Sequence, residues 1–64
     1  MAVVLQQNLG GRLEALMMLI ETAMERKAGL VLVQEPPECE GIRHPCYDFL
    51  RARRVLTARR VDSD

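Results

Sequence analysis

Aromatic side chains are almost missing from this chain of 64 residues, which has one tyrosine, one phenylalanine and no tryptophan. Its apolar volume therefore comes from leucine, valine, isoleucine, alanine and four methionines. A chain of this length buries only about 60% of the surface that its unfolded form exposes, so any core is small. The composition is sufficient for one helix packed on a few strands, and it is thin for a self-sufficient enzyme.

Long hydrophobic runs and secretion signals are also missing. The longest apolar run, "ALMMLI", has six residues, whereas a transmembrane helix needs about 20. The opening "MAVVLQQNLGG" has neither the basic start nor the apolar core of a signal peptide. The two cysteines, Cys39 and Cys46, are too few for a disulfide scaffold and favour a reducing compartment. We therefore expect an intracellular location, the nucleus included, with no secretion and no membrane partner.

The net charge is zero, but positive charge gathers near the carboxyl end. Residues 43–60 contain six arginines and one acid, Asp48. Arginine pairs with phosphate in bidentate geometry, so this segment suits contact with a nucleic-acid backbone. It equally suits a solvated face, or a surface that contacts another part of the protein. The candidates for nucleic-acid contact are Arg53, Arg54, Arg59 and Arg60.

The spacing of apolar residues predicts a strand followed by a helix. Residues 3–7, "VVLQQ", predict a short strand, and Gly10-Gly11 predict a turn. Residues 12–27 have helical periodicity, and Gly29 is expected to end the helix at the position after its cap. The apolar residues that recur at spacings of three and four, and so define one helix face, are Leu13, Leu16, Met17, Ile20 and Met24. The residues that widen this face are Ala15, Met18, Leu19 and Ala23.

A second strand is predicted at residues 30–34, "LVLVQ", because a continuous apolar run is typical of a parallel strand covered on both faces. Strand, helix and strand then form a right-handed βαβ unit. Residues 36–46 contain three prolines and predict a loop. A short helix around residues 47–53 is an open alternative, and we favour a basic strand over about 54–60. The expected fold is α/β: a βαβ unit plus a basic third strand.

Two polar residues follow the predicted strands at their carboxyl ends. Asn8 comes directly after the first strand, and Glu35 directly after the second. The carboxyl ends of parallel strands meet at one sheet edge, where ligands of α/β proteins gather. An amide and a carboxylate there suit a hard cation such as Mg²⁺. The alternative is structural, because asparagine before Gly-Gly is a common turn residue and glutamate before proline a common strand end.

These residues also carry a resemblance to a known family. The combination of "VVLQQNLGG", an amphipathic helix and "ETAMERKAGLVLVQEP" resembles the opening of the endonuclease/exonuclease/phosphatase (deoxyribonuclease I-like) family. The resemblance is strongest to the amino-terminal endonuclease domain of fungal non-LTR retrotransposons, whose basic third strand is similar to "RVLTARR". It implies an active-site role for Asn8, a catalytic Mg²⁺ or Mn²⁺ on Glu35, and hydrolysis of a phosphodiester in DNA. It also implies a two-sheet α/β sandwich.

The chain departs from that family in the residues that come later. The resemblance implies a further Asp–Asn pair and a His–Asp general base, and neither motif is present. His44 lies in a proline-rich loop and does not replace the general base, and Cys39, His44 and Cys46 match structural zinc spacing poorly. We therefore expect residues 1–64 to be a truncated amino-terminal part of such a domain, inactive alone.

Two other interpretations of the chain remain open. The first is a small non-catalytic interaction protein whose arginine-rich carboxyl segment binds nucleic acid or an acidic partner. The second is an unstable fragment with no function as a free chain, because a narrow sheet with exposed edges is prone to aggregation.

Overall fold

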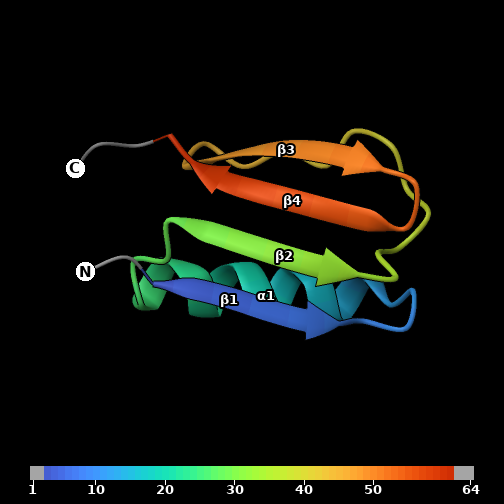
Figure 1. The fold of residues 1–64 in the computed structure, drawn as a ribbon, viewed down its shortest axis with the longest axis horizontal. Coiled ribbons are helices and arrows are strands. Elements are labelled where there is room, and N and C mark those ends of the chain that lie inside the picture. Colours follow the sequence, from blue (N-terminus) through green and yellow to red (C-terminus); the bar gives the residue numbers. More distant parts are fainter. Residues whose placement is uncertain (1–2, 62–64) are drawn as a thin grey trace.

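The computed structural model describes residues 3–61, so the first two and last three residues of the expected domain lie outside the description. The described residues form a four-stranded sheet in the order β1-β2-β4-β3 and a helix (Figure 1). β1 and β2 are parallel, as a βαβ unit requires, and the other two pairs are antiparallel. The predicted α/β class is confirmed. The elements are β1 (Val4–Asn8), α1 (Leu13–Glu25), β2 (Leu30–Gln34), β3 (Tyr47–Ala52) and β4 (Val55–Arg60).

The carboxyl end of α1 differs from the prediction. The helix ends at Glu25 with Arg26 as its cap, and Lys27 adopts the left-handed conformation with φ of 54°. Its N–H donates to the Met24 carbonyl at 3.1 Å, and the Ala28 N–H donates to the Ala23 carbonyl at 2.8 Å. These two bonds define a Schellman motif. Lys27, not Gly29, therefore occupies the position after the cap, because the helix stops earlier than its apolar periodicity suggests.

The buried face of α1 is narrower than the predicted one. All its buried residues belong to the predicted face, but four other members of that face are exposed, namely Leu13, Met17, Met18 and Met24. The helix covers only part of the sheet, so long side chains at the margins of its apolar face stay in solvent. Among residues 3–61 no helix has the length and apolar character to cross a membrane. The buried residues of α1 are Leu16, Leu19, Ile20 and Ala23.

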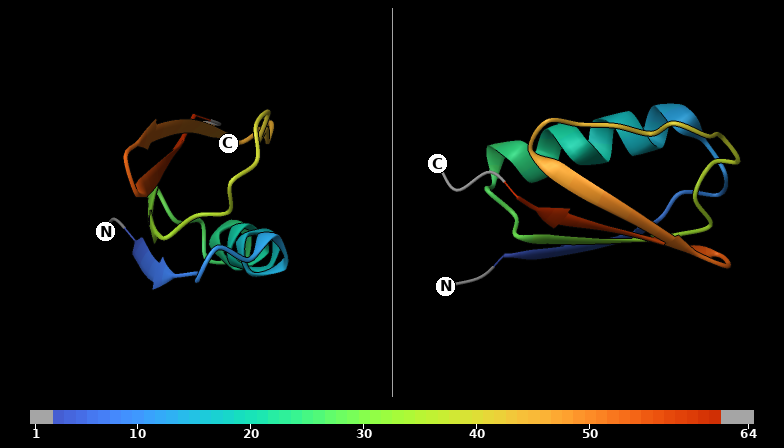
Figure 2. Two further views of the ribbon diagram at one scale, coloured as in Figure 1. Left: turned by 90° about the vertical axis from the view of Figure 1, so that its right-hand side faces the viewer. Right: turned by 90° about the horizontal axis from the view of Figure 1, so that it is seen from above.

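The core lies between α1 and one face of the sheet. Val31 and Val33 are fully buried on that face, whereas Leu30 and Leu32 alternate with them and are only half-buried. The helix and the 36–46 connection lie on the same side of the sheet (Figure 2). Within the described residues no element covers the other side. The expectation that β2 is covered on both faces is therefore wrong for residues 3–61.

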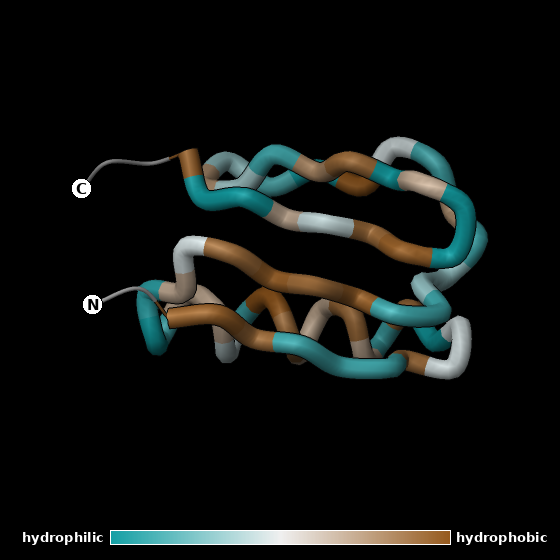
Figure 3. Tube along the Cα trace, viewed as in Figure 1, coloured by the Kyte–Doolittle hydropathy of each residue, from teal (hydrophilic) through white to brown (hydrophobic). Residues whose placement is uncertain are grey.

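The basic strand predicted over about 54–60 is confirmed as β4, but residues 47–52 form another strand and not a helix. β3 pairs with β4 from Tyr47↔Arg60 to Ala52↔Val55, so a two-residue turn joins them. The hydroxyl of Tyr47 reaches the core and donates to the Ala28 carbonyl at 2.8 Å. Pairing with β4 thus decides the structure of this segment over its local helical tendency. β2 is apolar over most of its length, whereas the β3–β4 turn is hydrophilic (Figure 3).

Candidate functional site

The carboxyl ends of β1 and β2 and the β3–β4 turn lie together at one end of the strands, which forms one edge of the sheet (right-hand side of Figure 1). Asn8 pairs with Gln34 in the parallel register, which places it beside Glu35. The Asn8 Nδ2–H donates to Glu35 Oε2 at 3.1 Å, and both residues are exposed. The predicted meeting of these two residues is confirmed. Asn8 is the last residue of β1, however, and not the residue after it.

The orientation of the Asn8 amide is determined by its second hydrogen bond. Its Oδ1 accepts the Gly10 N–H at 2.9 Å, which closes an Asx turn. A backbone N–H can only donate, so the oxygen of the amide faces Gly10 and the nitrogen faces Glu35. The amide nitrogen is thereby directed at the Glu35 carboxylate, so Asn8 orients that carboxylate.

The backbone of Glu35 joins three segments of the chain. Its carbonyl accepts the Gly11 N–H at 2.8 Å, and its N–H donates to the Arg54 carbonyl at 3.1 Å. Its φ is 49°, in the left-handed region, which costs a residue with a side chain roughly 1–2 kcal/mol. Hydrogen bonds from the turns on both sides hold Glu35 in this conformation, so its position is specified by the whole sheet edge.

The four arginines predicted to contact nucleic acid lie at opposite ends of β4. Arg53 and Arg54 form the β3–β4 turn next to Glu35. Arg59 pairs with Leu30 at the start of β2, and the Arg60 N–H donates to the Gly29 carbonyl at 2.9 Å. The predicted group is therefore two separate pairs and not one basic surface. The strand register separates them, and a sequence without pairing information does not contain it.

Sequence reasoning missed two other arginines at the edge that contains Glu35. Arg12 donates through Nε to the Leu9 carbonyl at 3.4 Å, directly after Asn8. Arg51 donates through a terminal guanidinium nitrogen to the Pro37 carbonyl at 2.9 Å, which holds the connection that leaves Glu35. Arg12 directly follows the predicted turn at Gly10-Gly11, and this is the one sequence signal for its position near Asn8.

The donor set at this edge fits part of a magnesium site. Mg²⁺ is commonly bound through one or two carboxylates, several waters and substrate phosphates. Glu35 supplies one carboxylate, already oriented by Asn8. Within residues 3–61 no group of three or more histidine, cysteine or acidic side chains is arranged to hold a metal ion. A cation at Glu35 would therefore need further ligands from a substrate or from other protein residues.

His44 lies away from this edge. It forms an isolated bridge with Tyr47, and Tyr47 pairs with Arg60 at the far end of β4. The His44 Nδ1 accepts the Cys46 N–H at 3.0 Å. His44 therefore lies near the opposite end of β4 from Glu35, and its expected lack of a general-base role stays a prediction.

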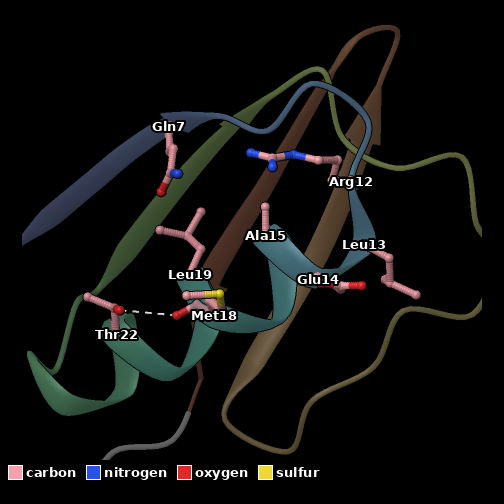
Figure 4. A pocket seen from close by; sticks show the side chains of 8 residues that line it. All are labelled: Gln7, Arg12, Leu13, Glu14, Ala15, Met18, Leu19 and Thr22. Atoms are coloured by element: carbon pink, nitrogen blue, oxygen red, sulfur yellow. Dashed lines mark hydrogen bonds between the residues drawn. The ribbon is translucent and has the colours of Figure 1, made fainter.

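A separate hollow of about 730 Å³ lies between β1 and α1. Figure 4 shows Gln7 and Arg12 among its lining side chains, with Arg12 extending from the loop that precedes α1. Neither Asn8 nor Glu35 lines it. The candidate site is therefore separate from this hollow, and both of its residues are exposed.

No known protein family, no curated protein and no solved structure matches the chain. The resemblance to the endonuclease/exonuclease/phosphatase family therefore rests on the motifs quoted above, and family membership stays a prediction.

Proposed function

We propose that this chain contributes the amino-terminal part of a metal-dependent phosphodiesterase site of the endonuclease/exonuclease/phosphatase type, which acts on DNA. Glu35 binds the metal, and Asn8 is a positioning residue that holds the carboxylate. The observation that carries the proposal is the Asn8–Glu35 hydrogen bond at the carboxyl ends of two adjacent parallel strands. The motifs around both residues supply the family.

The chemistry at this edge needs an oriented carboxylate and an open approach for a phosphate. A bound Mg²⁺ supplies Lewis-acid stabilisation of the charge that builds on the phosphate and on the leaving oxygen. Asn8 and the backbone bonds of Glu35 fix the carboxylate before any cation arrives. Such preorganisation avoids the cost of ordering the ligand during binding.

The open face of the sheet also supports a larger two-sheet architecture. Leu32 lies in register with Thr57, and Thr57 with Leu50, whose side chain is 70% exposed. Val4 and Val55 are exposed as well, and both share this face by strand alternation. A second sheet packed on this row accounts for its apolar character.

No candidate general base lies beside Glu35 in the described residues, so we expect no cutting by this chain alone.

Manganese binding tests the metal ligand. Mn²⁺ titrated into the purified chain and followed by electron paramagnetic resonance should show a weak site that Glu35→Gln abolishes. Glu38→Gln is the matched control, because Glu38 is an exposed glutamate in the connection that follows β2. Equal Mn²⁺ binding by the two variants would contradict the proposal.

Plasmid nicking and DNA binding test the activity and the alternative. Supercoiled DNA in Mg²⁺ should stay intact, and efficient nicking that Glu35→Gln removes would overturn the expectation of inactivity. DNA binding that is steeply salt-dependent yet indifferent to Mg²⁺ and to Glu35→Gln would instead favour the non-catalytic interaction protein.

A further inference from the structure

The β3–β4 turn is attached directly to the candidate metal ligand. The Glu35 N–H donates to the Arg54 carbonyl at 3.1 Å, and Gln34 pairs with Val55 in the antiparallel register. The backbone of the turn that contains Arg53 and Arg54 is therefore hydrogen-bonded directly to the backbone of Glu35. Movement of the turn relative to Glu35 would break that bond, so the two groups keep a defined relation.

The guanidinium groups of this turn are available for a ligand. In the described part of the chain, those of Arg53 and Arg54 make no hydrogen bond or ion pair, and both residues are exposed. The neighbouring arginines differ. Arg12 and Arg51 each donate to a backbone carbonyl, and Arg59 forms an ion pair with Asp48 at 3.8 Å, whereas the Arg60 guanidinium, like those of the turn, makes neither kind of contact in the described residues.

The pair Arg53 and Arg54 is far enough from the pair Arg59 and Arg60 for salt to screen one from the other. Arg54 and Arg59 are five positions apart, which is roughly 17 Å in an antiparallel strand. The Debye length at physiological salt is about 8 Å, so charges at the far end are largely screened from the Glu35 edge. A phosphate near Glu35 is therefore within range of Arg53 and Arg54 but largely screened from Arg59 and Arg60.

The backbone of Arg53 adds a second observation. Its φ is 56°, at a hairpin position where glycine, asparagine and aspartate are favoured. An arginine there destabilises the turn relative to glycine. A charged side chain with no partner in the described residues thus occupies a position where it lowers stability, as expected of a residue that serves binding.

We infer that Arg53 and Arg54 bind the phosphates that flank the phosphodiester at Asn8–Glu35, and that Arg59 and Arg60 do not. This inference rests on the proposed function and specifies how its DNA substrate is held. Arginine forks match phosphate oxygens in bidentate geometry, and adjacent residues of one turn suit neighbouring phosphates of one strand. Such contacts set the position of the backbone without reading base sequence.

Two double variants that remove equal charge test the inference. Arg53→Gln/Arg54→Gln and Arg59→Gln/Arg60→Gln are compared with the parent by fluorescence anisotropy of a short labelled DNA duplex in EDTA, over a range of KCl concentrations. The first variant should lose roughly tenfold in affinity at low salt, and its log–log salt slope should fall by about 1.8, the value for two phosphate contacts. The second should bind within about twofold of the parent, because its arginines contact no phosphate.

Equal losses in the two double variants, or no loss in either, would overturn the inference. A single Arg53→Gly variant guards against misfolding, because it removes the charge and relaxes the left-handed backbone. It should weaken DNA binding while unfolding at a higher urea concentration than the parent. Mn²⁺ binding to Glu35 without DNA tests the proposed metal ligand alone. Loss of Mn²⁺ binding would therefore be distinguishable from failure of the Arg53 and Arg54 inference, which the DNA-binding measurements test.

Discussion

The side-chain amide of Asn8 donates a hydrogen bond to the carboxylate of Glu35 across 3.1 Å, although the two residues are 27 positions apart in the chain. The parallel register Asn8↔Gln34 brings them together, and the Asx turn to Gly10 orients the amide. Asn8→Asp keeps an acceptor for the Gly10 N–H, and a change at Glu35 leaves the Asx turn in place.

Asn8→Asp should lower stability without metal and tighten Mn²⁺ binding. The aspartate keeps an acceptor for the Gly10 N–H, but it places a second carboxylate where the Nδ2 donor was. Repulsion between the two carboxylates disfavours the folded state at neutral pH, whereas a cation between them relieves it. Urea unfolding with and without Mn²⁺ measures both effects. Asn8→Ala is the control and should gain no affinity; an Asn8→Asp affinity equal to that of the parent would argue against a cation on Glu35.

Glu35→Gly and Glu35→Ala form a pair that isolates backbone strain. Both remove the carboxylate and its bond to Asn8, but only glycine adopts the φ of 49° without penalty. The glycine variant should exceed the alanine variant by about 1 kcal/mol in free energy of unfolding. Neither variant should bind Mn²⁺. Equal urea midpoints for the two would show that Glu35 leaves the left-handed region in solution.

The sequence was informative where one local pattern decides the structure. The apolar run Leu30–Val33 after a helical period predicts the βαβ unit, and its topology places Asn8 near Glu35. β3 was missed because its alternation is broken: Leu50 lies exposed, and the inward-facing position at Arg51 holds a charge. Hydropathy alone also does not distinguish the exposed methionines of α1 from its buried leucines.

Other features depend on pairing between segments distant in sequence. The bond from Glu35 to Arg54 and the separation of the arginines into two pairs follow from the register of β2 with β4. No residue type or spacing encodes that register by itself. A one-residue slip would bury the opposite face of β4, so the register is a property of the packed core around Leu56 and Ala58.

Lys27→Gly should stabilise the fold. Lys27 is the left-handed residue of the Schellman motif, with φ of 54°, and its side chain is exposed. Glycine is favoured there, so the free energy of unfolding should rise by about 1 kcal/mol. Lys27→Ala, which removes the same charge without relaxing φ, is the control. If both variants shift the urea midpoint equally, the effect comes from charge and not from the backbone.

Tyr47→Phe should lower stability and remove part of the sensitivity to alkaline pH. The side chain is 3% exposed, and its hydroxyl donates to the Ala28 carbonyl at 2.8 Å. Loss of this bond should cost about 1 kcal/mol at neutral pH. Burial raises the pKa of the Tyr47 hydroxyl above the ordinary tyrosine value, partly opposed by the nearby Arg60.

A raised pKa means that the folded state holds this proton more tightly than the unfolded state. The corresponding stabilisation is complete below about pH 10, the pKa of an unfolded tyrosine, and it is lost as the pH rises through the higher folded value. The difference between the unfolding free energies of parent and variant at each pH therefore reports on Tyr47. Urea unfolding from pH 7 to pH 11 should show that difference shrinking above pH 10. Parallel curves over the whole range would mean that the Tyr47 hydroxyl is not held in the core.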